Sequence, residues 1–203
     1  MNRFRHLLAL SSLVVTSVSA VAASVAASVA ASPAQASVLA ETACPTASKA
    51  EIKRSTAGKA DQPPRGSTAV KGLVTGYIPT GLAHGGVAAA KHKGWSEYGY
   101  AWWDDRDDVD PEHRALWVRV VCRPGAHKLS QLRRLPVDIG TFRWNTKIEK
   151  IGGRRVMSRQ GDGALGHGKY VGWVEREGIV ITVMASEPLV PDLGRIVRAI
   201  QLS

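Results

Sequence analysis

With 203 residues, the chain has room for one folded domain and accessory segments rather than several large domains. Lysine and arginine number 27 against 17 aspartates and glutamates, so we expect a basic surface that attracts anionic partners. The cations are scattered singly, which favours a solvated surface over a dedicated polyanion site and argues against a specific nucleic-acid partner. Two cysteines far apart in the chain exclude a cysteine metal motif.

The N-terminus has the pattern of an export signal. Two arginines precede an apolar run over residues 7–31, and Ala34 and Ala36 form the A-x-A pattern that a signal peptidase reads. We therefore predict a signal peptide over 1–36, cleaved after Ala36, and a secreted, extracellular protein with no transmembrane span. The alternative is an uncleaved segment that anchors the chain in the membrane, because the apolar run is long enough to cross a bilayer.

Export places Cys44 and Cys122 in an oxidising compartment, where an even number of cysteines favours a disulfide. Such a bridge closes a long loop and attaches the early exported chain to the strand that ends at Cys122. The alternative is two unpaired thiols.

Composition divides the exported chain near residue 70. Residues 37–69 are polar and contain a Pro-Pro pair, which predicts a flexible tether. Residues 70–203 hold every tryptophan and predict one globular domain. Early in this domain, residues 83–94 fit either a short helix or an irregular segment, because a glycine pair precedes an alanine run.

Two strands with alternating apolar residues follow, over 97–104 and 115–122. The acidic segment 104–112 between them fits the loop of a hairpin. A calcium loop is the alternative reading of the same acids. His113 stands where an EF-hand needs glycine and Arg119 where it needs glutamate, which excludes an EF-hand. A less regular calcium site is the remaining alternative.

The remaining pattern predicts more antiparallel sheet. A short helix over 130–135 precedes one hairpin that turns at Gly152-Gly153 and a second that turns at Glu177-Gly178. A final amphipathic helix has its apolar residues at helical spacing: Leu193, Ile196, Val197 and Ile200. We therefore predict an α+β fold in which a curved antiparallel sheet packs against a C-terminal helix.

The order of four motifs resembles a known family. The motifs are an opening Y-I-P-x-G, a glycine pair before a strand, a W-x-E hairpin and the closing helix: Tyr77, Ile78, Pro79, Gly81, Gly152, Gly153, Trp173, Glu175, Gly178 and the four apolar residues named above. Over residues 72–202 they resemble the uncharacterised extracytoplasmic domain attached to anti-sigma factors, which is similar to the lipoprotein-carrier half-barrel family. The resemblance implies a curved sheet that cradles helices, in a protein that binds or senses rather than catalyses. A cytoplasmic anti-sigma segment is lacking, which puts direct regulation of a sigma factor in doubt.

No catalytic motif is complete in the sequence. His84 in LAHGG resembles an oxyanion-loop histidine, but no G-x-S-x-G nucleophile motif accompanies it. The other histidines lack the paired spacings that zinc needs, so we expect no metal and no cofactor. Two acids for glycoside hydrolysis, drawn from Asp104, Asp105 and Glu175, remain an alternative because their separation depends on the fold.

Tryptophan offers the best candidates for binding, with six in the chain. Trp102 and Trp103 are adjacent, so on a strand they face opposite sides and one of them needs a cover or a ligand. We assign ligand binding to Trp95, Trp102, Trp103 and Trp173, with the alternative that all of them are core residues. The favoured function is an exported, non-catalytic, envelope-associated module that binds or senses an unknown ligand or an anionic envelope component. A secreted hydrolase and a basic surface-interaction protein are the alternatives.

Overall fold

The structure is a computed structural model that describes residues 43–61, 68–135, 142–161 and 167–203. The expected leader, with Ala34 and Ala36, lies outside these ranges. In the part of the chain that the structure describes, no helix has the length and apolar character needed to cross a bilayer. The helices are α1 (Lys49–Thr56), η1 (Leu129–Arg134), η3 (Glu187–Asp192) and α2 (Leu193–Arg198), of which η1 and η3 are 3-10 helices. The strands are β1 (Leu73–Thr75), β2 (His84–His92), β3 (Trp95–Trp103), β4 (Ala115–Cys122), β5 (Lys147–Ile151), β6 (Arg154–Gln160), β7 (Lys169–Arg176), β8 (Ile179–Ala185) and β9 (Ile200–Leu202).

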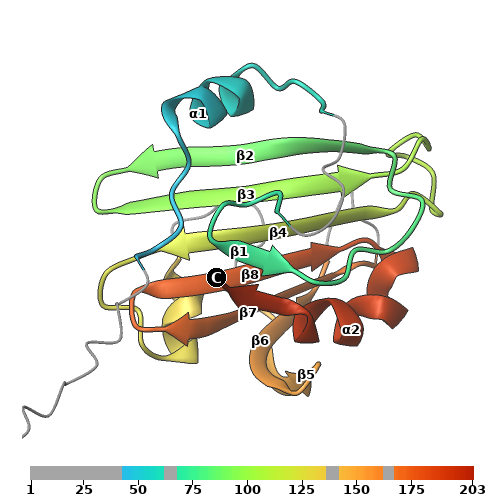
Figure 1. Cartoon of the computed structure of the whole chain (residues 1–203). Helices are drawn as coiled ribbons and strands as arrows, with labels where there is room; N and C mark the ends of the chain where they lie inside the picture. Colours follow the sequence, from blue (N-terminus) through green and yellow to red (C-terminus); the bar gives the residue numbers. More distant parts are fainter. Residues whose placement is uncertain (1–42, 62–67, 136–141, 162–166) are drawn as a thin grey trace, which may run out of the picture. The chain divides into compact units, whose positions relative to one another are not determined.

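Seven strands form one antiparallel sheet in the order β2-β3-β4-β8-β7-β6-β5, and β1 pairs separately with β9 (Figure 1). The three predicted hairpins, β3–β4, β5–β6 and β7–β8, are confirmed. At Gly152, Gly153 and Gly178 the backbone φ is 58°, 88° and 76°, a region that glycine enters without steric cost. The turn residues in the sequence therefore set where these hairpins reverse.

Both faces of the sheet carry a hydrophobic cluster. On the first face, alternate residues of the central strands pack against β1, β9, η3 and α2, and this cluster includes Tyr98, Trp102 and Trp173, each at most 3% exposed. On the second face, η1 covers part of β6 and β7, where Leu132 and Phe142 pack closely over Gly172. The second face near β3 and β4 has a cavity instead of a helix.

The C-terminal helix is shorter than predicted. Leu193, Ile196 and Val197 are buried as their spacing predicts, but α2 ends at Arg198 and Ile200 enters β9. Ile200 is still buried, because in β9 its side chain joins the same first-face cluster. The antiparallel sheet with a packed C-terminal helix is thus confirmed, whereas the two short α-helices of the described residues leave the fold between α+β and mainly β.

Residues 83–94, which the sequence left open, form a strand. β2 pairs with β3 along its whole length. Gly85 lies against the Tyr100 ring, since a Cβ at this position would come within 2.3 Å of that side chain. The glycine that discourages regular structure in the sequence therefore serves a close packing contact within the sheet.

Part of the segment predicted as a flexible tether forms α1, which packs on β2. Ser48 and Glu51 make a capping box: the Glu51 N–H donates to Ser48 Oγ (3.2 Å) and the Ser48 N–H donates to Glu51 Oε2 (2.8 Å). The Ala89 N–H of β2 donates to Ser55 Oγ over 2.9 Å, so α1 satisfies a donor on the edge strand. Composition concealed this helix because α1 buries none of its own residues.

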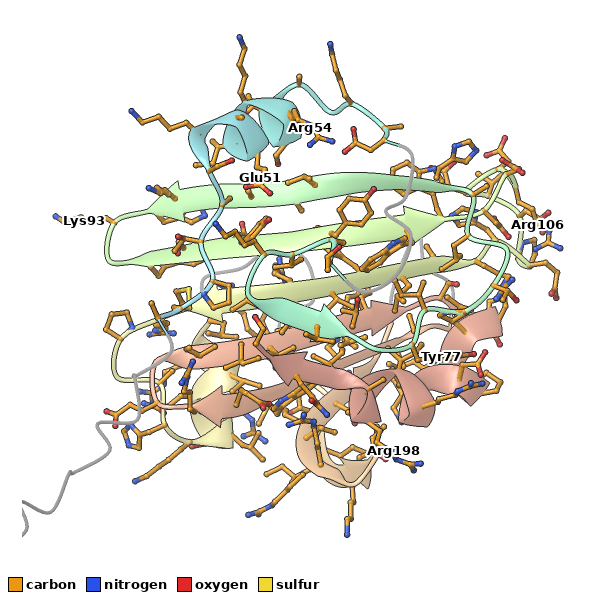
Figure 2. The ribbon with its side chains drawn as sticks, viewed as in Figure 1. Glu51, Arg54, Tyr77, Lys93, Arg106 and Arg198 are labelled. Atoms are coloured by element: carbon orange, nitrogen blue, oxygen red, sulfur yellow. A yellow bond between two sulfur atoms is a disulfide. The ribbon has the colours of Figure 1, made fainter. Side chains whose placement is uncertain are left out.

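Tyr98 connects α1 to the core. Its hydroxyl donates to Glu51 Oε1, which Figure 2 shows on α1, and accepts from the Lys71 N–H over 3.2 Å. Burial, followed by the bond to Glu51, raises the pKa of Tyr98 to about 12. Because this value lies above the ordinary 10.0, the contribution of Tyr98 to stability is complete below pH about 10 and is lost as the pH rises toward 12.

We expect Tyr98→Phe to weaken this alkaline loss of stability. The wild type should lose about 2 kcal/mol of unfolding free energy through Tyr98 between pH about 9 and about 12, and the variant should lose less. Burial also raises the pKa of Tyr100 to about 12. Tyr100 therefore contributes an alkaline loss of unfolding free energy in both proteins. Urea unfolding across this pH range measures the difference, with Tyr77→Phe as a control at a tyrosine that contacts Asp192 instead. Parallel pH profiles for the wild type and Tyr98→Phe would contradict the assignment.

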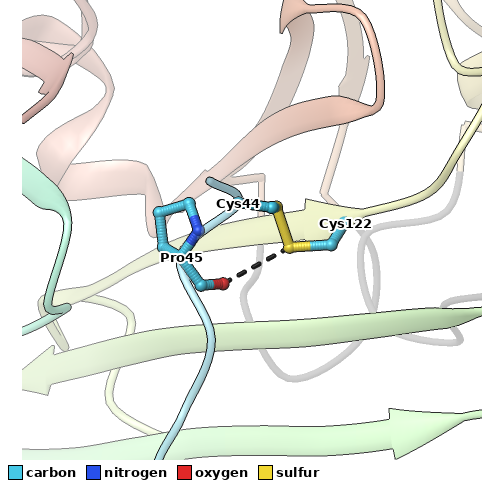
Figure 3. Close-up of a disulfide and its surroundings, with 3 residues drawn as sticks. All are labelled: Cys44, Pro45 and Cys122. Atoms are coloured by element: carbon cyan, nitrogen blue, oxygen red, sulfur yellow. Dashed lines mark hydrogen bonds between the residues drawn. A yellow bond between two sulfur atoms is a disulfide. The ribbon is translucent and has the colours of Figure 1, made fainter. Parts of the chain in front are cut away.

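The predicted disulfide joins Cys44 and Cys122, whose Cα atoms are 5.9 Å apart (Figure 3). Cys122 is the last residue of β4, so the bridge holds the segment before α1 at that end of the sheet. The Pro45 carbonyl oxygen lies 3.3 Å from Cys122 Sγ in the same place. A disulfide of this kind fits an oxidising, extracellular environment.

Candidate ligand-binding site

A cavity of about 320 Å³ lies at the end of the sheet where β3 and β4 meet their acidic connecting loop. The strand register pairs Trp103 with Ala115 and Ala101 with Trp117, so the two indoles lie diagonally and each stands opposite an alanine. Met184 lies opposite Trp117 on β8 and also lines the cavity. The small alanine side chains leave the space that the larger side chains enclose.

The rim of the cavity is polar and comes from the β3–β4 loop, through Arg106, Asp108 and His113. Asp104, only 7% exposed, holds this loop: it accepts from the Arg106 backbone N–H (3.3 Å) and Nη1 (2.8 Å), and His113 Nδ1 lies 3.0 Å from its Oδ1. Burial raises the pKa of Asp104, but N–H donors of Arg114 and Arg106 and nearby positive charges outweigh it and lower the pKa overall. The ionised Asp104 therefore fixes Arg106, labelled in Figure 2, beside the cavity, whereas His113 lies close to Asp104 without forming a hydrogen bond to it through its buried Nδ1.

Trp117, which lines the cavity, has a buried indole N–H. Its Nε1 is buried and has no hydrogen-bond partner within the described ranges. The Arg119 guanidinium lies over the ring, with Cζ 5.1 Å from the ring centroid. Leaving a buried N–H without an acceptor costs about 1–3 kcal/mol.

His84, the candidate for hydrolysis, is held by two neighbours. Its ring centroid is 6.3 Å from that of Trp103, and Nε2 lies 2.5 Å from Asp105 Oδ1. Across the residues with described positions, no serine hydroxyl is hydrogen-bonded to a histidine. His84 and Asp105 thus form an acid–histidine pair to which the described residues add no nucleophile.

Of the three carboxylates considered for glycoside hydrolysis, Glu175 lies far from Asp104 and Asp105. Asp104 and Asp105 directly follow β3, whereas Glu175 lies at the far end of β7, bonded to Arg154 (2.6 Å) and Trp173 (2.5 Å). The register through β4 and β8 places these acids at opposite ends of the sheet, roughly 20 Å apart for strands of this length. Paired catalytic carboxylates are at most about 10 Å apart, so Glu175 does not act together with the loop acids.

The acidic loop uses its own backbone to satisfy its carboxylates. Asp107 Oδ1 accepts from the Val109 N–H (3.3 Å), and Asp110 Oδ1 accepts from the Glu112 N–H (2.8 Å). Among residues whose positions are described, no group of three His, Cys, Asp or Glu side chains is arranged to hold a metal ion. The structure therefore describes this segment as the loop of a hairpin, as the alternating strands predict.

The four tryptophans assigned to ligand binding are not brought together. Trp102 and Trp103 both border the cavity, but Trp102, like Trp173, belongs to the first-face core, and these two residues are only 1% and 3% exposed. Trp95 lies in the β2–β3 hairpin and stacks on His92, with ring centroids 3.7 Å apart. Of the four, Trp103 is therefore the side chain placed to meet a ligand in this cavity.

Trp117 and Met184 complete the cavity and were missing from the sequence assignment. The alternation of β4 already placed Trp117 on the side opposite the core residues Leu116 and Val118, and this was the available signal. Met184 had no such signal, because its position next to Trp117 depends on the pairing of β4 with β8.

Comparison with models of known families, with curated proteins and with solved structures found no match. The resemblance to the extracytoplasmic domain of anti-sigma factors stays a prediction. The function is accordingly inferred from the cavity itself.

Proposed function

We propose that the chain is an exported, non-catalytic, envelope-associated binding module, and that the cavity between Trp103 and Trp117 holds a ring-sized ligand. The observation that carries the proposal is the diagonal pair of indoles beside Ala101 and Ala115. A volume of about 320 Å³ is at the small end of the range for ligand pockets. It suits one sugar ring or one aromatic ring.

The side chains suggest how such a ring is held. Indole faces pack against the C–H face of a sugar or against an aromatic ring. Arg106, Asp108 and His113 at the rim offer both donors and acceptors to polar substituents of the ring.

Titration of the indole N–H signals in a ¹H–¹⁵N NMR spectrum tests the proposal, with N-acetylglucosamine and indole as the two probes. We expect one probe to shift the Trp117 signal, because the bound ring packs beside this indole, and to leave the Trp144 signal unchanged. Ala101→Leu should fill the space between the indoles and lower the affinity at least about tenfold, equivalent to about 1.4 kcal/mol. Trp117→Ala should have a similar effect.

Trp144→Ala is the matched control, because Trp144 is 68% exposed and lies outside the cavity. It should bind the probe as the wild type does. Unchanged affinity in Ala101→Leu, or no shift of the Trp117 signal with either probe at saturating concentration, would contradict a ring-binding site here. Thermal unfolding of each variant checks that a lost affinity is not a lost fold.

A further inference from the structure

Positive charge is concentrated in one part of the chain. Residues 123–160 hold ten of the 27 lysines and arginines but two of the 17 acidic residues. The formal charge of this stretch is therefore +8, whereas the whole chain carries +10. Nearly all of the excess positive charge lies in the segment that contains η1, β5 and β6.

Large apolar side chains are exposed in the same segment. Trp144 directly precedes the β5 region and is 68% exposed, and Ile148 in β5 is 47% exposed. β5 is the last strand of the sheet, so its outer edge pairs with no other described strand. Arg133 of η1 reaches this edge, because its Nε donates to Thr146 Oγ1 over 3.2 Å.

The register of the β5–β6 hairpin places cations beside the apolar residues. Ile148 pairs with Met157, and Lys150 pairs with Arg155 two positions further on. Since side chains two positions apart share a face, Ile148, Lys150 and Arg155 lie on the same side of the hairpin. These residues are all exposed apart from Met157. We call the resulting set the β5 edge surface: Arg133, Trp144, Ile148, Lys150 and Arg155.

Glu149 is the acidic residue of the 123–160 stretch whose position the structure describes, and it faces the other side of the β5–β6 hairpin. Its register partner Val156 is buried in the first-face cluster, and its carboxylate accepts from Ser158 Oγ and lies 2.9 Å from Lys169 Nζ. Burial raises the pKa of Glu149, but these hydrogen bonds and the lysine charges outweigh it and lower the pKa overall. Glu149 is thus occupied elsewhere and does not neutralise the β5 edge surface.

We propose that the β5 edge surface docks on an anionic lipid bilayer, with Trp144 and Ile148 in the interfacial region and the cations against lipid phosphates. Lysines on an edge strand also protect it from pairing with another chain, but this protection does not need an exposed tryptophan. Tryptophan favours the membrane–water interface, and each cation near an anionic bilayer strengthens binding roughly fivefold. A soluble polyanion would be held by the cations alone, so the exposed apolar pair favours lipid as the partner.

A vesicle co-sedimentation assay tests the proposal. The protein is purified after export by the cells that produce it, and mass spectrometry identifies its N-terminal residue. We expect binding to vesicles that contain phosphatidylglycerol and much weaker binding to pure phosphatidylcholine. Lys150→Glu with Arg155→Glu should lower the partition coefficient about twentyfold or more, since two cations are replaced by repelled acids. Trp144→Ala with Ile148→Ala should lower it about tenfold, and Trp144 should become protected from a soluble quencher in the bound wild type.

The matched control for charge is Lys91→Glu with Lys93→Glu, which makes the same change on the β2–β3 hairpin at the other edge of the sheet, where Figure 2 labels Lys93. The control for the loss of exposed apolar surface is Val109→Ala, because Val109 lies in the acidic loop and is 86% exposed. Both should stay within about threefold of the wild type. An equal loss in the Lys91 and Lys93 variant would overturn the proposal in favour of diffuse charge attraction. The proposal would also be overturned, in favour of a soluble polyanion, if the Trp144 and Ile148 variant bound vesicles as the wild type does and the protein bound soluble polyphosphate as tightly as it binds vesicles.

The two proposals are separable in experiment. None of the residues of the β5 edge surface lines the cavity between Trp103 and Trp117. A protein that binds a ring but no vesicle, or the reverse, therefore identifies which inference fails.

Discussion

Replacing Cys44 and Cys122 together by serine is expected to lower the free energy of unfolding by about 4 kcal/mol. The bridge spans a sequence separation of 78, and breaking a cross-link of this length returns loop entropy to the unfolded chain. The folded state is affected as well, because the bridge holds the segment before α1 at the end of β4. We therefore also expect α1 to leave β2 more often and the Ala89 N–H, which it protects, to exchange faster with solvent.

Thermal and urea unfolding measure this effect, which corresponds to a fall in melting temperature of roughly 10 °C for a domain of this size. Wild-type protein in a reducing agent should match the double serine variant, and the reducing agent should leave that variant unchanged. A double variant within about 1 kcal/mol of the oxidised wild type would show that the bridge does not stabilise the fold.

Gly152→Ala is expected to destabilise the fold by about 3 kcal/mol, and Gly153→Ala by about 1 kcal/mol. Both glycines have positive φ in the β5–β6 turn, so both substitutions impose the same kind of backbone strain. At Gly152, however, an added Cβ would lie 2.4 Å from the Gly194 carbonyl oxygen and 2.8 Å from the Arg198 nitrogen. The α2 backbone would have to move, whereas at Gly153 no heavy atom lies within 4 Å.

Comparing the two variants isolates the packing of α2 against the turn. Urea unfolding at constant m-value gives the difference in stability. Equal destabilisation by the two substitutions would mean that the turn and α2 are not in close contact in solution.

Alternating apolar residues predicted the β3–β4 hairpin, and glycine-containing turns predicted where β5–β6 and β7–β8 reverse. Two elements escaped this reasoning for different physical reasons. α1 buries none of its residues, so the helix has no apolar stripe, and its capping box at Ser48 and Glu51 was the remaining signal. β2 contains a glycine whose purpose appears only when Tyr100 is placed across it.

The candidate site could be predicted only in part. Adjacent Trp102 and Trp103 implied that one indole lies outside the core, and Trp103 does line the cavity. The meeting of Trp103, Trp117 and Met184 depends on the register between three strands that are separated along the chain. Register of this kind is set by tertiary packing and turn geometry, which local sequence patterns do not reveal.

The pairing of β1 with β9 has a consequence for the order of folding. Leu73 is matched with Leu202, so β1 pairs with a strand that comes after all seven strands of the main sheet in sequence. Contacts between residues so distant in sequence form slowly. The β1–β9 pair is therefore expected to close late in folding, after the hairpins of the seven-stranded sheet have formed.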